Sequence, residues 1–204
     1  MNHNFLDKAY AARDADSTRA LYDDWSSSYD AEIGEIGYAT PDRCAAALAE
    51  FMPDKGAPIL DVGCGTGLSG AALKHAGFTV IDGVDVSADM LALAKQKNVY
   101  RTLTQIEADT PLSHTPGTYA AISAVGVVGA GGAPTTLFDM LMQSLGPGGK
   151  LVFSLNDHAL SDSANEARVM EWTDCAAAAL LFREHGDHLP GIDLKSNVYV
   201  LEKR

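Results

Sequence analysis

The sequence has few cysteines, no long hydrophobic run and no surplus of positive charge. Its three cysteines, Cys44, Cys64 and Cys175, are odd in number and far apart, and no C-x-x-C pair occurs. This usage suggests neither a disulfide framework nor a zinc site, so we expect no bound metal and a reducing, cytoplasmic setting. No apolar run approaches the roughly 18 residues that would span a bilayer, and the N-terminus carries no apolar signal segment, so we expect no membrane contact.

The charge balance excludes one large class of partners. The 204 residues include 15 Lys and Arg against 27 Asp and Glu, a net charge of −12 with histidine neutral. Such a chain repels phosphate backbones and has no spare cations to neutralise them, so we expect no nucleic-acid partner. Hydrophobic residues make up 47%, as in ordinary globular proteins, and the length suits a single domain over residues 1–204. We expect a monomer or a homodimer.

From residue 58 onwards, short apolar runs alternate with helical patterns, which is typical of strand–helix units and a parallel sheet. Strands are predicted at 59–62, 78–84, 100–107, 119–125 and 151–155. Helices are predicted at 21–36, 41–51, 66–76, after Ser87, which can cap the next helix, at 134–145 and around 164–175. The segments 180–189 and 196–203 predict an antiparallel hairpin that turns at Pro190-Gly191. We therefore predict an α/β fold, a doubly wound, Rossmann-like, seven-stranded and mostly parallel sheet over residues 57–204.

The strongest chemical signal is Ile59-Leu-Asp61-Val-Gly63-Cys64-Gly65-Thr66-Gly67, a strand that runs into a glycine turn and opens a helix. Glycine permits unusual backbone angles and lets a ligand lie on main-chain N–H groups. Asp85 ends the next strand, where a carboxylate can accept both ribose hydroxyls of a nucleoside. Glycine turns also form where a strand packs tightly on a helix, and an Asp at a strand end is commonly a helix cap. Together, the two elements indicate a nucleoside-containing cofactor.

Several motifs follow one another in the order of a known family. They are Asp61-x-Gly63-x-Gly65-x-Gly67, Gly83-Val-Asp85-x-Ser87-x-x-Met90, Ala108-Asp109 and Leu145-Gly-Pro-Gly-Gly149, preceded by Tyr22-Asp-Asp-Trp25-Ser-Ser-Ser-Tyr29-Asp30. With Val125-Gly126-Val-Val-Gly129 and the segment 189–199, the chain resembles class I S-adenosylmethionine-dependent methyltransferases over residues 20–203. Within that family it is most similar to the methyltransferase-like proteins of the Williams-Beuren chromosomal region.

The resemblance implies a set of cofactor-binding residues. Gly63, Cys64, Gly65 and Gly67 would lie against the methionine part of S-adenosylmethionine, with Asp61 near its ammonium and Asp85 on the ribose. Val86 and Met90 would flank the adenine, with Asp109 and Thr110 at its polar edge and Val125 nearby. The aromatic residues Tyr22, Trp25 and Tyr29 would close over the cofactor from a helical lid at residues 1–40, although they can equally be core aromatics.

The resemblance also implies methyl transfer to an O or N acceptor, with S-adenosylhomocysteine as the product. His158, in Asn156-Asp157-His158 after the fifth strand, is the candidate general base, and otherwise a polar loop residue. The fourth strand is not followed by the Asn/Asp-Pro-Pro-Tyr/Phe motif of enzymes that methylate exocyclic amino groups. No acid ends that strand to complete a catechol-type metal site. A small-molecule acceptor is therefore expected.

Two other functions remain open from the sequence. An NAD-dependent oxidoreductase would use a similar glycine turn, but its third glycine would fall at Leu68, and the Tyr199-x-x-x-Lys203 pair lies in a predicted strand rather than a helix. A non-catalytic cofactor-binding or protein-interaction module is the second alternative, because the loop 129–132 consists of glycine and alanine without a reactive side chain.

Overall fold

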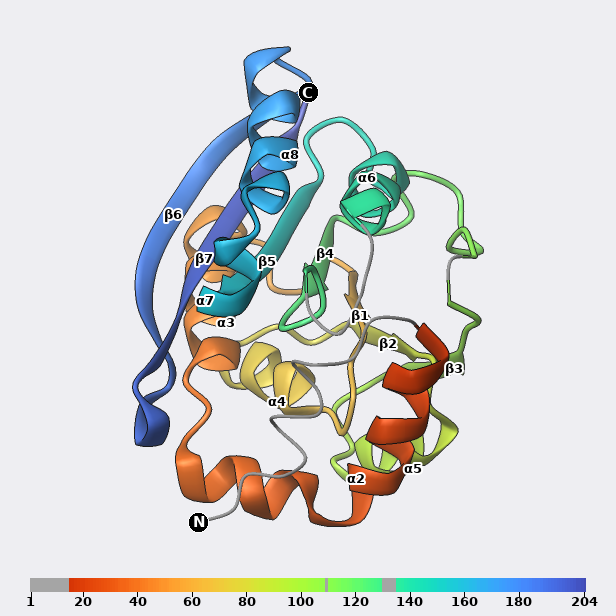
Figure 1. Cartoon of the computed structure of the whole chain (residues 1–204). Helices are drawn as coiled ribbons and strands as arrows, with labels where there is room; N and C mark the ends of the chain where they lie inside the picture. Colours follow the sequence, from red (N-terminus) through yellow and green to blue (C-terminus); the bar gives the residue numbers. More distant parts are fainter. Residues whose placement is uncertain (1–14, 109, 130–134) are drawn as a thin grey trace.

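The strands form one seven-stranded sheet in the order β3-β2-β1-β4-β5-β7-β6 (Figure 1). The computed structural model describes residues 15–108, 110–129 and 135–204. The strands are β1 (Ile59–Val62), β2 (Ile81–Asp85), β3 (Thr102–Gln105), β4 (Ala121–Ala124), β5 (Lys150–Asn156), β6 (Ala178–Leu189) and β7 (Leu194–Lys203). The first five in chain order pair in parallel, whereas β7 runs antiparallel to both β5 and β6. The predicted fold class is therefore confirmed.

The helices of the described chain differ from the predicted ones mainly at their ends. They are α2 (Ala15–Ile36), α3 (Thr40–Phe51), α4 (Leu68–His75), α5 (Ala88–Gln96), α6 (Thr135–Ser144), α7 (Asp157–Ser161) and α8 (Ser163–Asp174), with a short 3-10 turn η1 (Pro190–Ile192). Helix α4 begins two residues later than predicted because Gly67 precedes it in the left-handed conformation. Helix α7 was not predicted. It begins after Asn156, whose Oδ1 accepts the Ala159 N–H at 2.9 Å.

Strand β2 begins at Ile81 rather than at residue 78. The Thr79 N–H donates to the Lys55 carbonyl at 3.0 Å, so the backbone before the strand bonds to a loop and not to the sheet. None of the described helices is long and apolar enough to cross a membrane.

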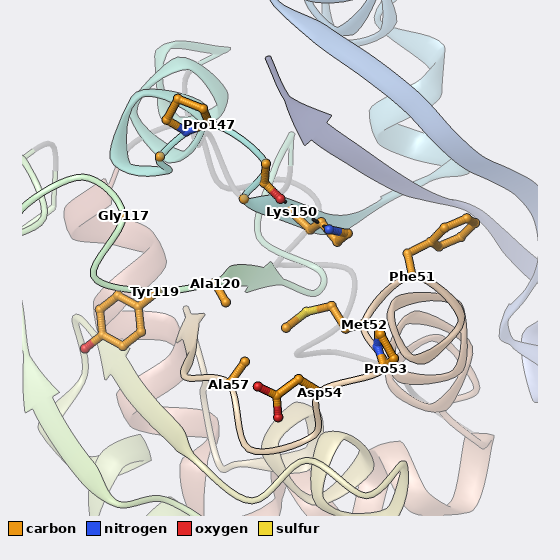
Figure 2. Close-up of a pocket in the computed structure, with 13 residues that line it drawn as sticks. Phe51, Met52, Pro53, Asp54, Ala57, Gly117, Tyr119, Ala120, Pro147 and Lys150 are labelled. Atoms are coloured by element: carbon orange, nitrogen blue, oxygen red, sulfur yellow. Dashed lines mark hydrogen bonds between the residues drawn. The ribbon is translucent and has the colours of Figure 1, made fainter.

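A shallow pocket of about 350 Å³ lies at the edge of the sheet where the parallel strands begin (Figure 2). Its lining includes Met52 and Pro53 after α3, Tyr119 and Ala120 before β4, and Pro147 before β5 and Lys150 at its start. In doubly wound sheets, ligands bind at the opposite edge, outside the carboxyl ends of the strands. This pocket is therefore remote from the predicted cofactor residues.

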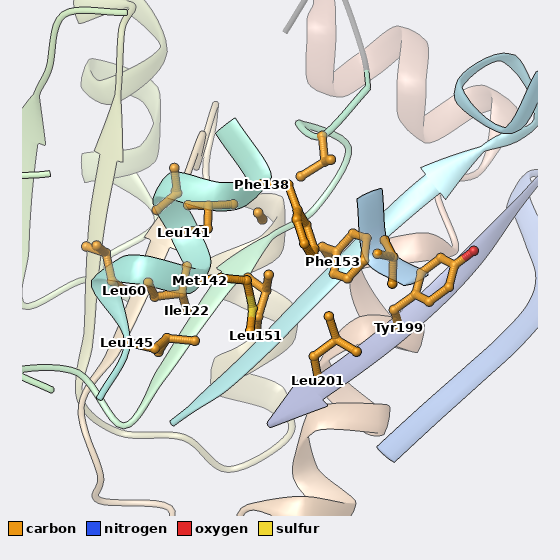
Figure 3. Packing of buried hydrophobic residues seen from close by; sticks show 14 of the residues in the cluster. Leu60, Ile122, Phe138, Leu141, Met142, Leu145, Leu151, Phe153, Tyr199 and Leu201 are labelled. Carbon is orange, nitrogen blue, oxygen red and sulfur yellow. The ribbon is translucent and has the colours of Figure 1, made fainter. Parts of the chain in front are cut away.

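Alternate residues of the central strands supply two hydrophobic layers, one on each face of the sheet. Leu151, Phe153 and Tyr199 face α6, α7 and α8 (Figure 3). There the Phe153 ring stacks on Tyr199 with 4.8 Å between centroids and meets Phe138 edge-on at 5.3 Å. The neighbouring Val152 and Val200 face the other way, into the layer formed with α3 and α4. Helices on both faces explain why these strands read as continuous apolar runs.

A third, smaller cluster attaches α2 to the rest of the molecule. Trp25 is 2% exposed and packs with Ile33 and Leu189, and the Tyr29 ring meets the Trp25 ring edge-on at 4.7 Å. The sequence left open whether the aromatic residues of the N-terminal segment close over the cofactor or belong to a core. The described part of that segment has this small core, which it shares with the end of β6.

Candidate functional site

The glycine turn after β1 adopts backbone conformations with positive φ, which glycine tolerates better than other residues. Gly63, Gly65 and Gly67 have φ values of +66°, +52° and +92°, which side chains strongly disfavour. A Cβ on Gly63 would lie 2.5 Å from the Val127 side chain, whereas a Cβ on Gly65 would meet no atom within 4 Å. Gly63 is thus required for packing. Gly65 instead borders open space that a ligand can occupy.

Asp61 lies beneath the turn as a fully buried carboxyl group. Its Oδ2 accepts hydrogen bonds from Ser69 Oγ at 2.6 Å and Tyr100 Oη at 2.7 Å, whereas its Oδ1 is buried without a partner. Burial raises the pKa of Asp61 to about 6, and the two hydrogen bonds oppose that rise. Ser123, paired with Asp61 across β1 and β4, also lowers the pKa, although its Oγ makes no hydrogen bond of normal geometry. The free Oδ1 is a fitting partner for a cationic group.

Asp85 ends β2 and connects the glycine turn to the start of α5. Its Oδ2 accepts the Gly65 N–H at 2.8 Å and its Oδ1 accepts the Ser87 N–H at 2.9 Å. Burial raises the pKa of this carboxyl, and these backbone hydrogen bonds oppose the rise. The Ser87 hydroxyl accepts the Met90 N–H at 3.1 Å, so Ser87 caps α5 as predicted. Asp85 is 9% exposed, and each carboxylate oxygen still has a lone pair to offer a hydroxyl group.

Helix α2 lies over this turn through acidic side chains. Asp30 accepts a hydrogen bond from Thr66 Oγ1 at 2.5 Å and pairs with Lys97 Nζ at 2.5 Å. Asp23 accepts a short hydrogen bond from Ser87 Oγ. The helix therefore contacts both the glycine turn and the start of α5.

The other predicted cofactor residues lie around the same edge, with different exposures. Cys64 is buried beneath the turn, where its Sγ lies 3.0 Å from the position of a Cβ on Gly83. Met90 is 2% exposed, Val125 is 9% exposed, Val86 is half-buried and Thr110 is exposed. Trp25 belongs to the third core cluster rather than to an open site. Asp109 and the side chain of Tyr22 lie outside the described residues.

The candidate base His158 is the second residue of α7, at the carboxyl end of β5, and it is exposed. Its neighbour Asp157 accepts the Lys195 N–H through Oδ2 at 3.0 Å. The Tyr199–Lys203 pair of the oxidoreductase alternative lies on β7, and the two side chains bond elsewhere. Tyr199 Oη donates to Glu166 Oε1 at 2.5 Å and Lys203 Nζ to the Leu145 carbonyl at 2.5 Å. This geometry does not favour an oxidoreductase.

Two parts of the site were not predicted from the sequence. Tyr100, 39 residues from Asp61, was assigned only to a strand, yet its hydroxyl bonds Asp61 and accepts the Gly70 N–H at 3.1 Å. Burial, followed by the negative charge of Asp61, raises the pKa of this phenol. The second part is a buried polar cluster around His188. Neither carries a local motif, because each is assembled from distant segments. Across the described ranges, no cluster of His, Cys, Asp and Glu suitable for a metal ion is found.

Comparison with known proteins identifies the family. A family model described as a methyltransferase domain matches residues 37–197. Methyltransferase-like protein 27 of Homo sapiens is 35% identical over 117 residues, which cover 56% of this chain and 48% of that protein. The 18S rRNA (guanine(1575)-N(7))-methyltransferase of Saccharomyces cerevisiae is 32% identical over 125 residues, 54% of this chain and 46% of that protein. The chain thus spans about half the length of these curated relatives.

A solved structure extends the fold comparison. The crystal structure of the [4+2]-cyclase SpnF superposes with a TM-score of 0.70 at 17% identity, covering 94% of this chain and 97% of SpnF. At that identity the likeness concerns the fold alone. The family model, by contrast, matches most of the sequence and includes both the glycine turn and Asp85. The chain belongs to the methyltransferase domain family, as its sequence motifs predicted.

Proposed function

We propose that the protein transfers a methyl group from S-adenosylmethionine to an O or N atom of a small molecule. The observation that carries this proposal is the arrangement at the carboxyl ends of β1 and β2. There Gly65 has open space beside it and donates its N–H to the carboxyl of Asp85, while Asp61, near the end of the strand that leads into the turn, is a buried carboxyl with one unpaired oxygen. The sheet order reverses at β1 and β4, and such a switch point is where open α/β sheets bind ligands.

The residues present fit this cofactor. The turn from Gly63 to Gly67 would cradle the methionine part, since Gly65 leaves space beside the backbone. The unpaired Oδ1 of Asp61 would accept a hydrogen bond from the ammonium, directly or through water. Asp85 would accept the ribose hydroxyls while it holds the Gly65 N–H. Val86 and Met90 would flank the adenine, with Asp109 and Thr110 at its polar edge.

The cofactor supplies an activated methyl group bound to a cationic sulfur. In the transfer, the lone pair of the acceptor atom forms a bond to the methyl carbon as the carbon–sulfur bond breaks. The electron pair of the broken bond remains on sulfur. The protein would contribute mainly by holding the two reactants in line and by keeping water away from them. An acceptor that arrives protonated also loses a proton, and His158 is the proposed base for that step.

The proposal of a small acceptor rests on charge and on the edge where it would bind. The excess of acidic residues, 27 against 15 basic ones, opposes binding to RNA, although two relatives are rRNA methyltransferases. We further propose a monomer or homodimer in the cytoplasm, a setting that the three free cysteines suit.

The test uses S-adenosylmethionine labelled on its methyl group, together with a fractionated metabolite extract and, in parallel, total RNA. Label should pass to a small molecule with the wild-type protein and should be strongly reduced with Asp85→Ala. Asp89→Ala is the matched control, because Asp89 is an exposed carboxylate on the first turn of the neighbouring helix α5. Label in RNA would overturn the choice of acceptor.

A second candidate, a cofactor-binding module that acts through protein association, is favoured by one observation. The candidate base His158 is exposed rather than enclosed beside the glycine turn. Binding of S-adenosylmethionine without labelling of any fraction, together with capture of the cofactor-loaded protein by a partner, would support this candidate over methyl transfer.

A further inference from the structure

A buried polar cluster lies where α3, β6 and β7 meet at the carboxyl edge of the sheet. His188 is 5% exposed, and Thr40 and Ser196 are fully buried. Thr40 Oγ1 lies 2.8 Å from His188 Nδ1 and 3.0 Å from Ser196 Oγ. Arg43 Nη1 donates to Ser196 Oγ at 3.1 Å and to the carbonyls of Asp187 and Ser196 at 2.9 Å and 3.2 Å. The proposed function assigns no role to this cluster.

The donors and acceptors in the cluster determine the tautomer of His188. Arginine can only donate, so Ser196 Oγ accepts from Arg43. Ser196 is fully buried, and Thr40 is the other partner of its Oγ in the described chain, so the Ser196 hydroxyl proton has an acceptor only if it is donated to Thr40 Oγ1. Thr40 must then direct its own proton to His188 Nδ1. His188 Nδ1 therefore accepts, and the ring proton is on Nε2.

The Nε2–H group of His188 remains a hydrogen-bond donor at neutral pH. Burial lowers the pKa of His188 to about 4. The negative charge of Asp157 opposes this fall in pKa, whereas the positive charges of Arg43 and His158 add to it. The ring is therefore neutral at pH 7 and carries a single proton on Nε2. The buried side-chain atoms left unpaired in the described ranges are Asp61 Oδ1, His114 Nε2 and Ser123 Oγ. His188 Nε2 makes no hydrogen bond there and is not among them, so it retains access to solvent.

Contacts connect this donor to the glycine turn that is proposed to hold the cofactor. The side chain of Val127, after β4, packs on Gly63 of the glycine turn. Next to it, the hydroxyl of Tyr38 lies 2.7 Å from the position of a Cβ on Gly126. The Tyr38 ring then meets His188 edge-on, with 5.2 Å between centroids. His188 is thus linked to the glycine turn through Tyr38, which precedes α3, and through Gly126 and Val127, which follow β4.

We propose that His188 Nε2–H donates a hydrogen bond to a neutral carbonyl oxygen of the methyl acceptor and thereby orients it. This inference rests on the proposed function. A neutral oxygen is favoured over a carboxylate because the His188 ring is itself uncharged, the nearby Arg43 is already paired with Glu184, and the whole chain carries a net charge of −12. Thr40, Ser196 and Arg43 are positioning residues, since they act through the tautomer of His188.

The test follows His188 by NMR in protein labelled with ¹⁵N-histidine at pH 7, with and without S-adenosylhomocysteine. The wild-type spectrum should show Nε2 protonated and Nδ1 unprotonated. N-methylacetamide should shift the Nε2 signal saturably, acetate should shift it less, and propylammonium should leave it unchanged. His185, on the same strand with its Nδ1 bonded to Asn197 Oδ1 at 2.9 Å, is the internal control. A proton on Nδ1, or an Nε2 signal that no carbonyl probe shifts, would overturn the inference.

Variants of Thr40 separate positioning from folding. Thr40→Val removes the hydroxyl at similar volume, so His188 should populate both tautomers and bind the amide probe at least fivefold more weakly. Thr40→Ser keeps the hydroxyl and should restore the wild-type spectrum. Equal amide affinity in the Val and Ser variants would contradict the positioning role. Calorimetry with S-adenosylhomocysteine distinguishes the two proposals: absent binding to wild-type protein refutes the proposed function, whereas normal binding with an unresponsive His188 refutes only this inference.

Discussion

At the scale of single residues, the position of Asp61 determines how the site responds to pH. Its carboxyl is fully buried, one oxygen has no partner, and burial raises its pKa from the ordinary 3.8 to about 6. Between these two values the folded protein keeps a proton that the unfolded chain has released. The contribution of Asp61 to folding stability should therefore fall as pH rises from about 4 to about 6, and level off above that.

The variant Asp61→Asn tests this expectation, because the amide cannot ionise. Relative to wild type, the variant should gain roughly 1–3 kcal/mol of unfolding free energy between pH 4 and pH 7, the worth of a shift of about two pKa units. Urea unfolding at several pH values measures the difference, in which titration of the other acids cancels. Parallel stability curves for the two proteins would show that Asp61 ionises normally.

Asp85 should contribute to cofactor binding through both of its carboxylate oxygens. We expect Asp85→Ala to weaken S-adenosylhomocysteine binding by about 1.5–3 kcal/mol, because charge-assisted hydrogen bonds to the ribose and the brace on Gly65 are lost together. Calorimetry gives the affinity and circular dichroism confirms the fold. The exposed Asp89→Ala should bind normally. Unchanged affinity in a folded Asp85→Ala protein would assign the ribose to other residues.

At the scale of elements, the glycine turn can be compared with a second glycine of similar conformation. Gly65 and Gly148 have φ values of +52° and +78°, and a Cβ on either would meet no atom within 4 Å. Alanine at either position should cost stability through backbone strain of roughly 1–2 kcal/mol. Gly148→Ala should leave cofactor affinity unchanged, because Gly148 lies at the opposite edge of the sheet. Gly65→Ala should reduce the affinity, and Gly65→Val should abolish binding. Equal binding by the Gly65 and Gly148 variants would show that Gly65 serves only the backbone conformation of the turn.

Helix α2 should become more ordered when the cofactor binds. It touches the glycine turn through Asp30 and Thr66 and the start of α5 through Asp23 and Ser87. Hydrogen exchange over residues 20–36 should slow when S-adenosylhomocysteine is added, as expected for a lid that excludes water. Asp30→Asn should diminish that slowing. Exchange that is equally slow with and without the ligand would make α2 a fixed part of the core.

The elements differ in how far the sequence could predict them. Strand β1, the cap at Ser87 and the C-terminal hairpin were predicted because local patterns specify them. Helix α7 was missed because its start depends on one side-chain cap at Asn156. Tyr100 and His188 were missed as site residues for another reason. Their partners Asp61 and Thr40 lie 39 and 148 residues away. The residue pattern within one segment does not predict contacts with such distant segments.

At the scale of the whole molecule, the charge of −12 should decide what the protein binds. We expect no binding to a fluorescein-labelled RNA hairpin in anisotropy titrations at 50 mM salt, where weak phosphate contacts are strongest. A basic RNA-binding domain is the positive control. Binding that weakens steeply between 50 and 200 mM salt would show that a local basic surface overrides the net charge and would favour an RNA acceptor.

Because the three thiols differ in burial, their rates of alkylation can report local opening of the protein. Cys44 and Cys64 are enclosed in the core and beneath the glycine turn, and burial raises the pKa of both thiols, whereas Cys175 is exposed after α8. A maleimide should therefore attach to Cys175 at once and to the other two only as the chain opens. Because Cys64 belongs to the glycine turn that is proposed to hold the cofactor, the rate of its alkylation should fall when S-adenosylhomocysteine binds, without any engineered label.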